Sequence, residues 1–214
     1  MPAPASAPAP APASTPAPGP TVTGLAPDYP IRTERLLLRP WRSDEEATFF
    51  RLRGDPEVVR YLYQEPITRD EAGEVLAQRS SLHAITEPGQ WLNLAVEVAS
   101  TGFVAGDVGI AWTSDEHRTA EVGYTFLPDH QGHGYATEAA AAMVDLAFTG
   151  LAVHRVVGHL DGRNDASAAV LRRLGMRLEA HLVENEWVKG EWTDDKVYAV
   201  LDREWAARKG QPRS

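Results

Sequence analysis

The chain has 214 residues, of which 43% are hydrophobic and 24% are charged, and its formal net charge is −9. This composition suffices for one domain with a real core, while the negative charge argues against a broad surface for DNA or RNA and suits an amine-bearing partner better. The chain contains no cysteine, which excludes disulfides, thiolate zinc sites and a cysteine nucleophile.

The first segment, residues 1–28, differs in composition from the rest of the chain. It opens with MPAPASAPAPAPASTPAPGP, a Pro/Ala-rich sequence that favours extended conformations and has nothing large to bury. It lacks the basic start and the apolar block of a signal peptide, and no run in the chain approaches the roughly 20 apolar residues of a membrane span. We therefore expect a cytoplasmic protein without a membrane partner, in which a disordered extension precedes a folded domain at 29–207 and a short tail at 208–214.

The first part of the folded domain predicts one strand and several helices. Residues 31–41, IRTERLLLRPW, alternate charged and apolar side chains, which is typical of a strand. Three helix starts follow, each marked by a capping box or by a proline at the first helical position: Ser43 with Glu46, Asp55–Pro56, and Thr68 with Glu71.

The second part predicts a sheet with further helices. The runs WLNLAVEV, FVAGDVGIAW and AEVGYTFL indicate three strands of an antiparallel meander. A long helix follows from about Gly134 to Phe148, with Gly150 as its stop signal. The strand HRVVGHL, the helix NDASAAVLRRLG, the strands MRLEAHLVE and KVYAVLD, and a short terminal helix complete the chain. The order predicts an α+β fold with a central mixed, mostly antiparallel sheet flanked by helices.

A glycine-spaced polar turn, HQGHGYA, begins the long helix. A helix start exposes unpaired N–H groups and the positive end of a dipole, and Gly132 and Gly134 would let an anion approach closely. The turn has no lysine, so it is not a P-loop, and it follows an antiparallel meander, which is the wrong context for a dinucleotide fold. The remaining pattern, Gln-x-x-Gly-x-Ala at a strand-to-helix junction, indicates either a phosphate site or a glycine-rich cap without a ligand.

Four segments together resemble the GCN5-related N-acetyltransferases (GNAT) and, among them, the RimJ/RimL-type acetyltransferases. They are RTERLLLRPW, AEVGYTFLPDHQGHGYATEA, NDASAAVLRRLGM and EWVKGEWTDDKVYAVLDREW, and the resemblance runs from about Ile31 to Trp205. It implies an acetyl-CoA-dependent N-acyltransferase of the EC 2.3.1 class, with acetyl-CoA as cosubstrate and no metal. It also implies residues that bind the cosubstrate: Phe126, Leu127, Gln131, Gly132, His133, Gly134, Tyr135, Ala136, Thr137 and Asn164.

The implied reaction is direct attack of an amine on a thioester, and it makes three demands on the site. A base must accept the amine proton, a donor must stabilise the oxyanion, and the departing thiolate benefits from a proton. RimL-like members use a glutamate base and a serine acid, which correspond here to Glu186 and Ser167. Glu121, on the fourth predicted strand, is a second candidate base and ranks below Glu186. An irregularity of that strand near Phe126 and Leu127 is the expected place of the oxyanion donor.

A simpler structural role stays open for most of these residues. Ser167 and Asn164 are suited to capping a helix, and Glu186 to an exposed position in a hairpin. Tyr135 is either a CoA contact or packing of the first helical turn. Trp187 and Trp192 either line the acceptor pocket or pack within the hairpin.

Two hypotheses about function follow. The leading one is an N-acetyltransferase that acts on a primary amine, either a protein N-terminus or a small-molecule amine. The alternative is a non-catalytic acyl-CoA-binding sensor or scaffold, which would have no use for Ser167 together with Glu186. A homodimer is possible, because dimers are common among proteins of this type. Acidic residues of the first helices could favour a cationic acceptor or could form a solvated face: Asp44, Glu45, Glu46 and Glu65.

Overall fold

A central sheet of eight strands organises residues 24–209, the part of the chain that the computed structural model describes. The strand order is β1-β2-β3-β4-β5-β6-β8-β7, and every neighbouring pair is antiparallel except β5 and β6. The strands are β1 (Ile31–Arg32), β2 (Leu36–Arg39), β3 (Trp91–Val98), β4 (Val104–Ser114), β5 (Thr119–Phe126), β6 (Arg155–Asp161), β7 (Arg177–Val188) and β8 (Glu191–Leu201). The predicted fold class is confirmed.

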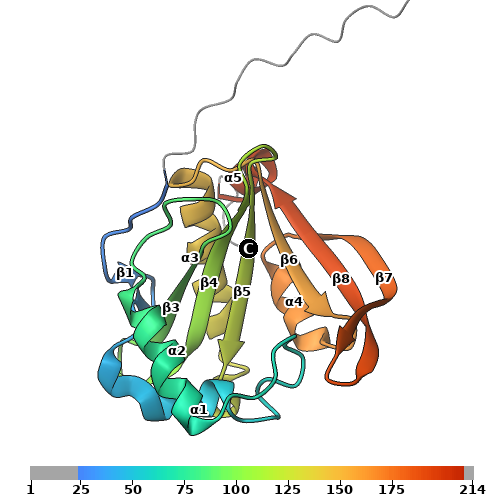
Figure 1. Cartoon of the computed structure of the whole chain (residues 1–214). Helices are drawn as coiled ribbons and strands as arrows, with labels where there is room; N and C mark the ends of the chain where they lie inside the picture. Colours follow the sequence, from blue (N-terminus) through green and yellow to red (C-terminus); the bar gives the residue numbers. More distant parts are fainter. Residues whose placement is uncertain (1–23, 210–214) are drawn as a thin grey trace, which may run out of the picture.

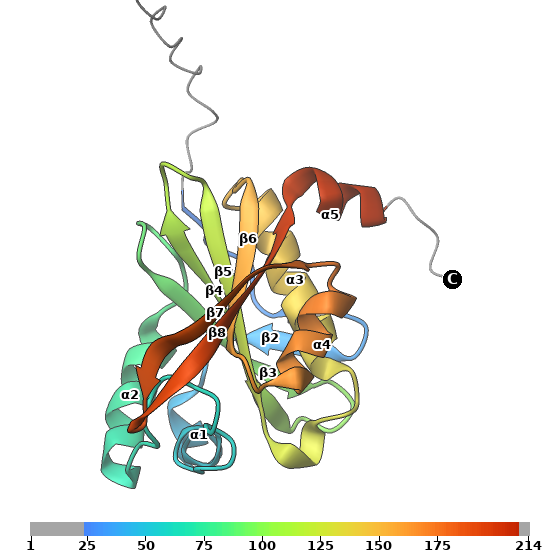
Figure 2. The same ribbon diagram turned by 90° about the vertical axis from the view of Figure 1, so that its right-hand side faces the viewer.

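Helices lie on both faces of the sheet, and Figure 2 shows α1 and α2 on one side with α3 and α4 on the other. The α-helices are α1 (Glu46–Arg53), α2 (Arg69–Ser81), α3 (Tyr135–Thr149), α4 (Asp165–Arg173) and α5 (Asp202–Lys209), and two short 3₁₀ helices lie at Ser43–Glu45 and Pro128–His130. In the described range, no helix is long and apolar enough to cross a membrane.

Strand alternation assigns different roles to the two faces of the meander. Val108, Ile110 and Val122 belong to the main core together with the buried residues of α3, such as Met143. The neighbouring positions on each strand face α1 and α2 instead. These positions carry Asp107, Thr125 and Glu121, together with Gly109 and Gly123. One face of the meander is therefore apolar, and the other carries polar side chains and glycines.

The two parallel strands part along their length. β5 and β6 pair only at three positions, the last being Glu121 with Val157, although β5 continues to Phe126 and β6 to Asp161. Figure 1 shows the two strands side by side at the top of the view and spread apart toward the bottom. Because pairing stops there, backbone groups of β5 lack a strand partner on this side, and the sheet has an opening near its middle.

The predicted first strand is in fact a hairpin. Thr33 N donates to Leu36 O at 3.0 Å, and Ile31 pairs with Leu38, so the segment 31–41 forms β1 and β2 rather than one strand. The alternating pattern is the same in both arms, which is why the sequence conceals the turn. Thr33 also donates to Glu138 of α3 at 2.6 Å, a tertiary contact that stabilises the turn.

The first two predicted helix starts are also corrected. Glu45, and not Glu46, closes the box at the first helix, because its carboxylate accepts from Arg42 N at 2.8 Å. Residues 54–68, the α1–α2 loop, contain turns where Asp55–Pro56 predicts a helix. The Asp55 side chain accepts from Glu57 N at 2.9 Å and Val59 N donates to Asp55 O at 3.1 Å, so the segment makes a single helical turn that does not continue into a helix. The third start is confirmed, since Thr68 and Glu71 cap α2.

The folded part begins earlier than residue 29. Most of the expected extension, residues 1–23, lies outside the described residues, but Leu25 is buried in the main core. Leu25 forms a bridge with Ile85 through two backbone hydrogen bonds of 2.7 and 2.8 Å. Its side chain lies against Gly150, where a Cβ atom would come within 2.4 Å of it. The small size of Gly150 therefore makes room for Leu25 at the end of α3.

Candidate active site

The opening between β5 and β6 leads into a cleft of about 1810 Å³. Its walls come from β5, the start of α3, β6, the start of α4 and the α1–α2 loop. Almost all of the expected site residues line this cleft. The exceptions are Leu127 and Glu186. Segments far apart in the sequence therefore meet at one place, as the resemblance implies.

The glycine turn forms the mouth of the cleft at the start of α3. Gly132 and Gly134 both have left-handed backbone angles, with φ of +78° and +79°, and Gly134 is the N-cap residue. A Cβ atom at Gly132 would meet nothing within 4 Å, so the backbone is open to a ligand there. The first amides of the helix have no intrahelical partners. These features fit a diphosphate, because an anion is favoured where free N–H groups and a helix dipole converge.

Two contacts hold the turn in place. Gln131 Nε2 donates to Phe126 O at 3.0 Å, which links the turn to the end of β5. Arg35 Nη1 donates to His133 O at 2.9 Å, and its guanidinium lies 5.0 Å from the centre of the Tyr135 ring. Arg35 is not predictable from the sequence, because it is almost 100 residues before the turn and belongs to no local motif.

Arg35 also compensates an acidic residue beside the glycine turn. Its Nε lies 2.7 Å from Glu138 Oε2 in the first turn of α3. Burial alone would raise the pKa of Glu138, but hydrogen bonds from Thr33 and Arg35 lower it below the ordinary value. Glu138 therefore stays ionised, and the paired arginine limits its repulsion of a bound anion.

The backbone of β5 presents donors to the opening, although not where the sequence suggests. Leu127 N donates to Ala105 O at 2.9 Å, and Leu127 is buried against α1 and α2, so its amide is unavailable. Alternate residues of an antiparallel strand direct their N–H groups to the same neighbour, so those of Tyr124 and Phe126 face the opening. β5 pairs regularly with β4 through Phe126, so the opening arises from its separation from β6 and not from an irregularity near Phe126.

Glu121 lies at the point where β5 and β6 begin to part, on the face that carries α1 and α2. Its side chain is partly buried and lines the cleft. Burial raises the pKa of Glu121, His159 of β6 opposes this shift, and Asp195 of β8 adds to it. The result is a carboxyl group whose pKa is above the ordinary value of 4.5, which brings it closer to the range of a general base.

Glu186 occupies a different place and does not line the cleft, whereas Glu121 does. It lies on β7 within the β7–β8 hairpin, where the register shifts between Leu182 and Glu186. Its carboxylate accepts from Asn185 at 2.9 Å. The neighbouring Trp187 and Trp192 pack edge to face across the hairpin with 60% and 57% of their surface exposed. They do not line the cleft.

The start of α4 closes the other side of the cleft. Asn164 is the N-cap residue, and its Oδ1 accepts from Ser167 N at 3.0 Å, so the expected capping role is real. Tyr124 of β5 donates its hydroxyl to Ser167 O at 3.0 Å, which holds the helix start against the edge of the opening. Burial raises the pKa of Tyr124 strongly, so this hydroxyl keeps its proton.

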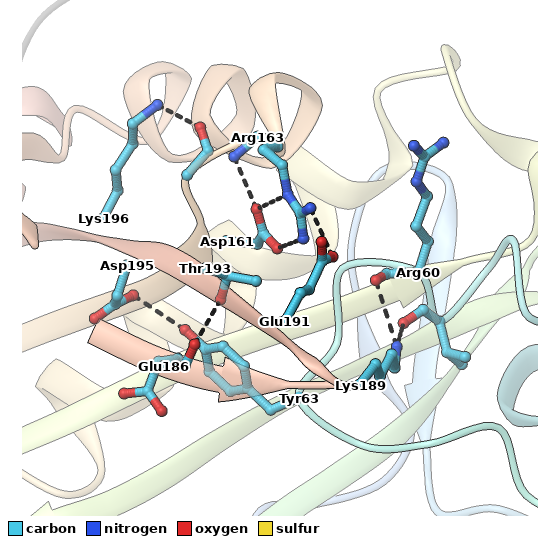
Figure 3. A network of polar contacts seen from close by, with 12 residues as sticks. Arg60, Tyr63, Asp161, Arg163, Glu186, Lys189, Glu191, Thr193, Asp195 and Lys196 are labelled. Atoms are coloured by element: carbon cyan, nitrogen blue, oxygen red, sulfur yellow. Dashed lines mark hydrogen bonds and ion pairs between the residues drawn. The ribbon is translucent and has the colours of Figure 1, made fainter. Parts of the chain in front are cut away.

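A polar network attaches the α1–α2 loop to the β7–β8 hairpin (Figure 3). Tyr63 of the loop donates to Asp195 at 3.0 Å, and His159 Nδ1 lies 3.0 Å from the same carboxylate. Lys189 of the hairpin donates to Val59 O at 2.5 Å. Asp195 is only 3% exposed. Its role is not predictable from the sequence, because the pattern of β8 predicts nothing but a strand. This network shapes the α1–α2 side of the cleft.

The chain is similar to acetyltransferases in sequence and in structure. Residues 35–177 match the family model described as an acetyltransferase (GNAT) domain. An uncharacterized N-acetyltransferase of Bacillus licheniformis, p20, is 29% identical over 81% of this chain and 97% of its own length. The spermidine N(1)-acetyltransferase of Escherichia coli (strain K12) is 26% identical over 82% of this chain and 90% of its own length. The structure of a probable GNAT-family acetyltransferase from Chromobacterium violaceum aligns with a TM-score of 0.75 at 28% identity, covering 94% of this chain and all of that one.

Proposed function

Because the chain belongs to the GNAT acetyltransferase family, we propose that it transfers the acetyl group of acetyl-CoA to a primary amine. Relatives named spermidine N(1)-acetyltransferase support an amine as the acceptor. The observation that carries the proposal is one continuous cleft, which is lined both by the glycine-rich start of α3 and by the partly buried carboxyl group of Glu121. The Asn164-x-x-Ser167 helix start further suggests the RimJ/RimL type.

Acetyl-CoA supplies an activated thioester, and the donor side of the cleft holds it by its diphosphate. In our proposal the amides at the start of α3 bind the diphosphate: Gln131, Gly132, His133, Gly134, Tyr135, Ala136 and Thr137. Arg35 positions this turn through His133 O. Asn164 lies beside the pantetheine arm while it caps α4.

Glu121 is the base in this proposal. An alkylamine is largely protonated at neutral pH, so its proton must be removed before or during attack on the thioester carbonyl. The raised pKa of Glu121 makes it a better match to this task than an exposed carboxylate. The N–H groups of Tyr124 and Phe126 face the opening and are suited to stabilise the developing oxyanion. In the proposal, Ser167, which lines the cleft at the start of α4, donates a proton to the departing thiolate.

The test is a comparison of Glu121→Gln with Glu186→Gln, in which thiol release from acetyl-CoA is measured over a panel of amines and N-terminal peptides. We expect Glu121→Gln to lower kcat by about 10²–10⁴-fold, the range for a lost general base, with unchanged acetyl-CoA affinity by calorimetry. The matched variant Glu186→Gln should keep nearly full turnover. The reverse order would transfer the role of the base to Glu186.

The panel also tests the alternative of a binding module. Such a protein would bind CoA and unfold at a higher temperature in its presence, yet no amine would release thiol. If acetyl-CoA gave no calorimetric heat at all, the assignment of the glycine turn as a diphosphate site would be wrong.

A further inference from the structure

Two arginines on the α1/α2 side of the cleft share a single acidic partner. Arg53 ends α1, Arg79 lies in the last turn of α2, and both line the cleft with side chains that are 10% and 19% exposed. Arg53 donates to Asp107 and also to Thr125 Oγ1, the latter at 2.9 Å. Arg79 Nη1 lies 3.9 Å from the same Asp107 carboxylate, which is an ion pair but too long for a hydrogen bond.

The charges of this group do not balance. An arginine side chain is always protonated, so Arg53 and Arg79 carry two positive charges against the one negative charge of Asp107. Burial lowers the pKa of Arg79, Asp107 opposes the shift, and the charge of Arg53 adds to it. Among the described residues, Arg53 Nε and Arg79 Nη1 are buried and have no hydrogen-bond partner. Since buried donors are nearly always satisfied, the group can accept one more anion.

This group lies on the same face of the sheet as Glu121. Thr125, Gly123 and Glu121 alternate along β5 on that face, so Glu121 is about 13 Å along the strand from Thr125, the residue that Arg53 contacts. The ring of Trp91 covers the space between them, because a Cβ atom at Gly123 would lie 3.4 Å from it. The room left by Gly123 and by Gly109, which faces it on β4, is taken by the Trp91 ring and, beside Gly109, by Asn93.

We infer that the acceptor carries a carboxylate as well as its amine, as an amino-acid derivative or a short peptide does. The carboxylate binds Arg79 and Arg53, the body of the acceptor lies on Trp91, and the amine reaches Glu121. The inference rests on the proposed acetyl transfer and specifies which class of amine the cleft selects. Planar guanidinium groups suit a carboxylate because they form paired hydrogen bonds with it.

A polyamine fits this side of the cleft poorly. Its second cationic group would lie against two buried guanidinium groups, and like charges in a buried site repel strongly. Glu57 of the α1–α2 loop lines the cleft too, but it is exposed and adds little attraction for a cation. The inferred acceptor therefore differs from spermidine, the acceptor in the names of the spermidine acetyltransferases among the relatives.

The experiment compares acceptors that differ only in the carboxylate. Dipeptides with a free C-terminus, their C-terminal amides and spermidine are assayed for thiol release with saturating acetyl-CoA. We expect kcat/KM to be about 10- to 100-fold higher for the free carboxylate than for the amide, as for a hydrogen bond to a charged group. Arg79→Met should remove most of this preference by lowering kcat/KM for the acid only, and Arg79→Lys should retain part of it.

Arg51→Met is the matched control, because Arg51 lies on α1 with a side chain that is 60% exposed. It should leave the preference intact, and the KM for acetyl-CoA should stay constant in all variants. Equal activity on acid and amide, or a preference for spermidine, would overturn the inference and leave the proposed acetyl transfer standing. If no amine released thiol, the acetyl transfer itself would fail, and the inference would fail with it.

Discussion

The burial of a single carboxyl group has consequences for the pH dependence of turnover. Glu121 must be ionised to accept a proton, and burial raises its pKa above the ordinary value of 4.5. Turnover should therefore increase as the pH rises through the raised pKa and should be lost at lower pH. The midpoint of this change should lie at a higher pH than an exposed glutamate would give. The pH profile of kcat/KM checks this, and the acidic limb should vanish in Glu121→Gln. An unchanged limb in that variant would assign it to another group.

Gly132 offers a test of how open the backbone must be at the mouth of the cleft. It shares a left-handed φ and empty surroundings with Gly102, which lies in the turn between β3 and β4. Alanine at either position should cost about 1 kcal/mol of unfolding free energy through backbone strain. Only Gly132→Ala should also weaken acetyl-CoA binding in a calorimetric titration. Equal affinities in the two variants would mean that no ligand approaches Gly132.

The residues that could be predicted are those in local motifs. The glycine turn, Asn164 and Ser167 lie at helix starts that line the cleft, because short-range spacing fixes a helix start. The relative positions of Glu121 and Glu186 were not predictable, since they depend on where two strands part and where a hairpin shifts register. Other residues have no local signal at all, because they come from distant segments and reach the cleft only after folding: Arg35, Arg53, Arg79, Asp107 and His159, the last in contact with Asp195.

At the scale of elements, the start of α4 performs two tasks that substitution can separate. Asn164→Ala removes the cap on Ser167 N and should lower the unfolding free energy by about 1 kcal/mol. Asn164→Asp keeps an accepting oxygen at the N-cap and should retain nearly full stability. If the amide also contacts acetyl-CoA, the aspartate variant should nevertheless bind it more weakly. Urea unfolding and calorimetry measure the two effects, and a stable alanine variant would contradict the capping role.

Elements with a strong period were predictable, and those defined by tertiary contacts were not. The long apolar stripe of α3 and the alternating pattern of β3, β4 and β5 predicted these elements, and the structure contains them in the predicted order. The turn between β1 and β2 was not predictable, because the hydrogen bond that stabilises it joins Thr33 to Glu138 of α3, more than 100 residues later. The α1–α2 loop begins with a helical turn at Asp55, but the chain then leaves the helical path, and Tyr63 contacts Asp195 of the distant β8.

At the scale of the whole molecule, the boundary of the folded part can be tested by truncation. A chain that starts at Gly24 should unfold at the same urea concentration as the full chain, since it keeps Leu25 in the core. A chain that starts at Tyr29 loses that side chain and its two hydrogen bonds to Ile85. It should be less stable by about 2 kcal/mol, the contribution of one buried leucine. Equal midpoints for the two truncated chains would place the boundary after Leu25.

The separation of β5 from β6 also bears on the order of events in a reaction cycle. The cleft is lined from α3 and α4 on one face of the sheet and from the α1–α2 loop on the other, so two molecules can enter from opposite sides and meet in the middle. Neither has to leave before its counterpart arrives. The chain has no cysteine thiol on which an acyl group could be held, so this architecture supports direct transfer within a ternary complex. Double-reciprocal plots of initial rates at several concentrations of the second substrate should therefore intersect rather than run parallel.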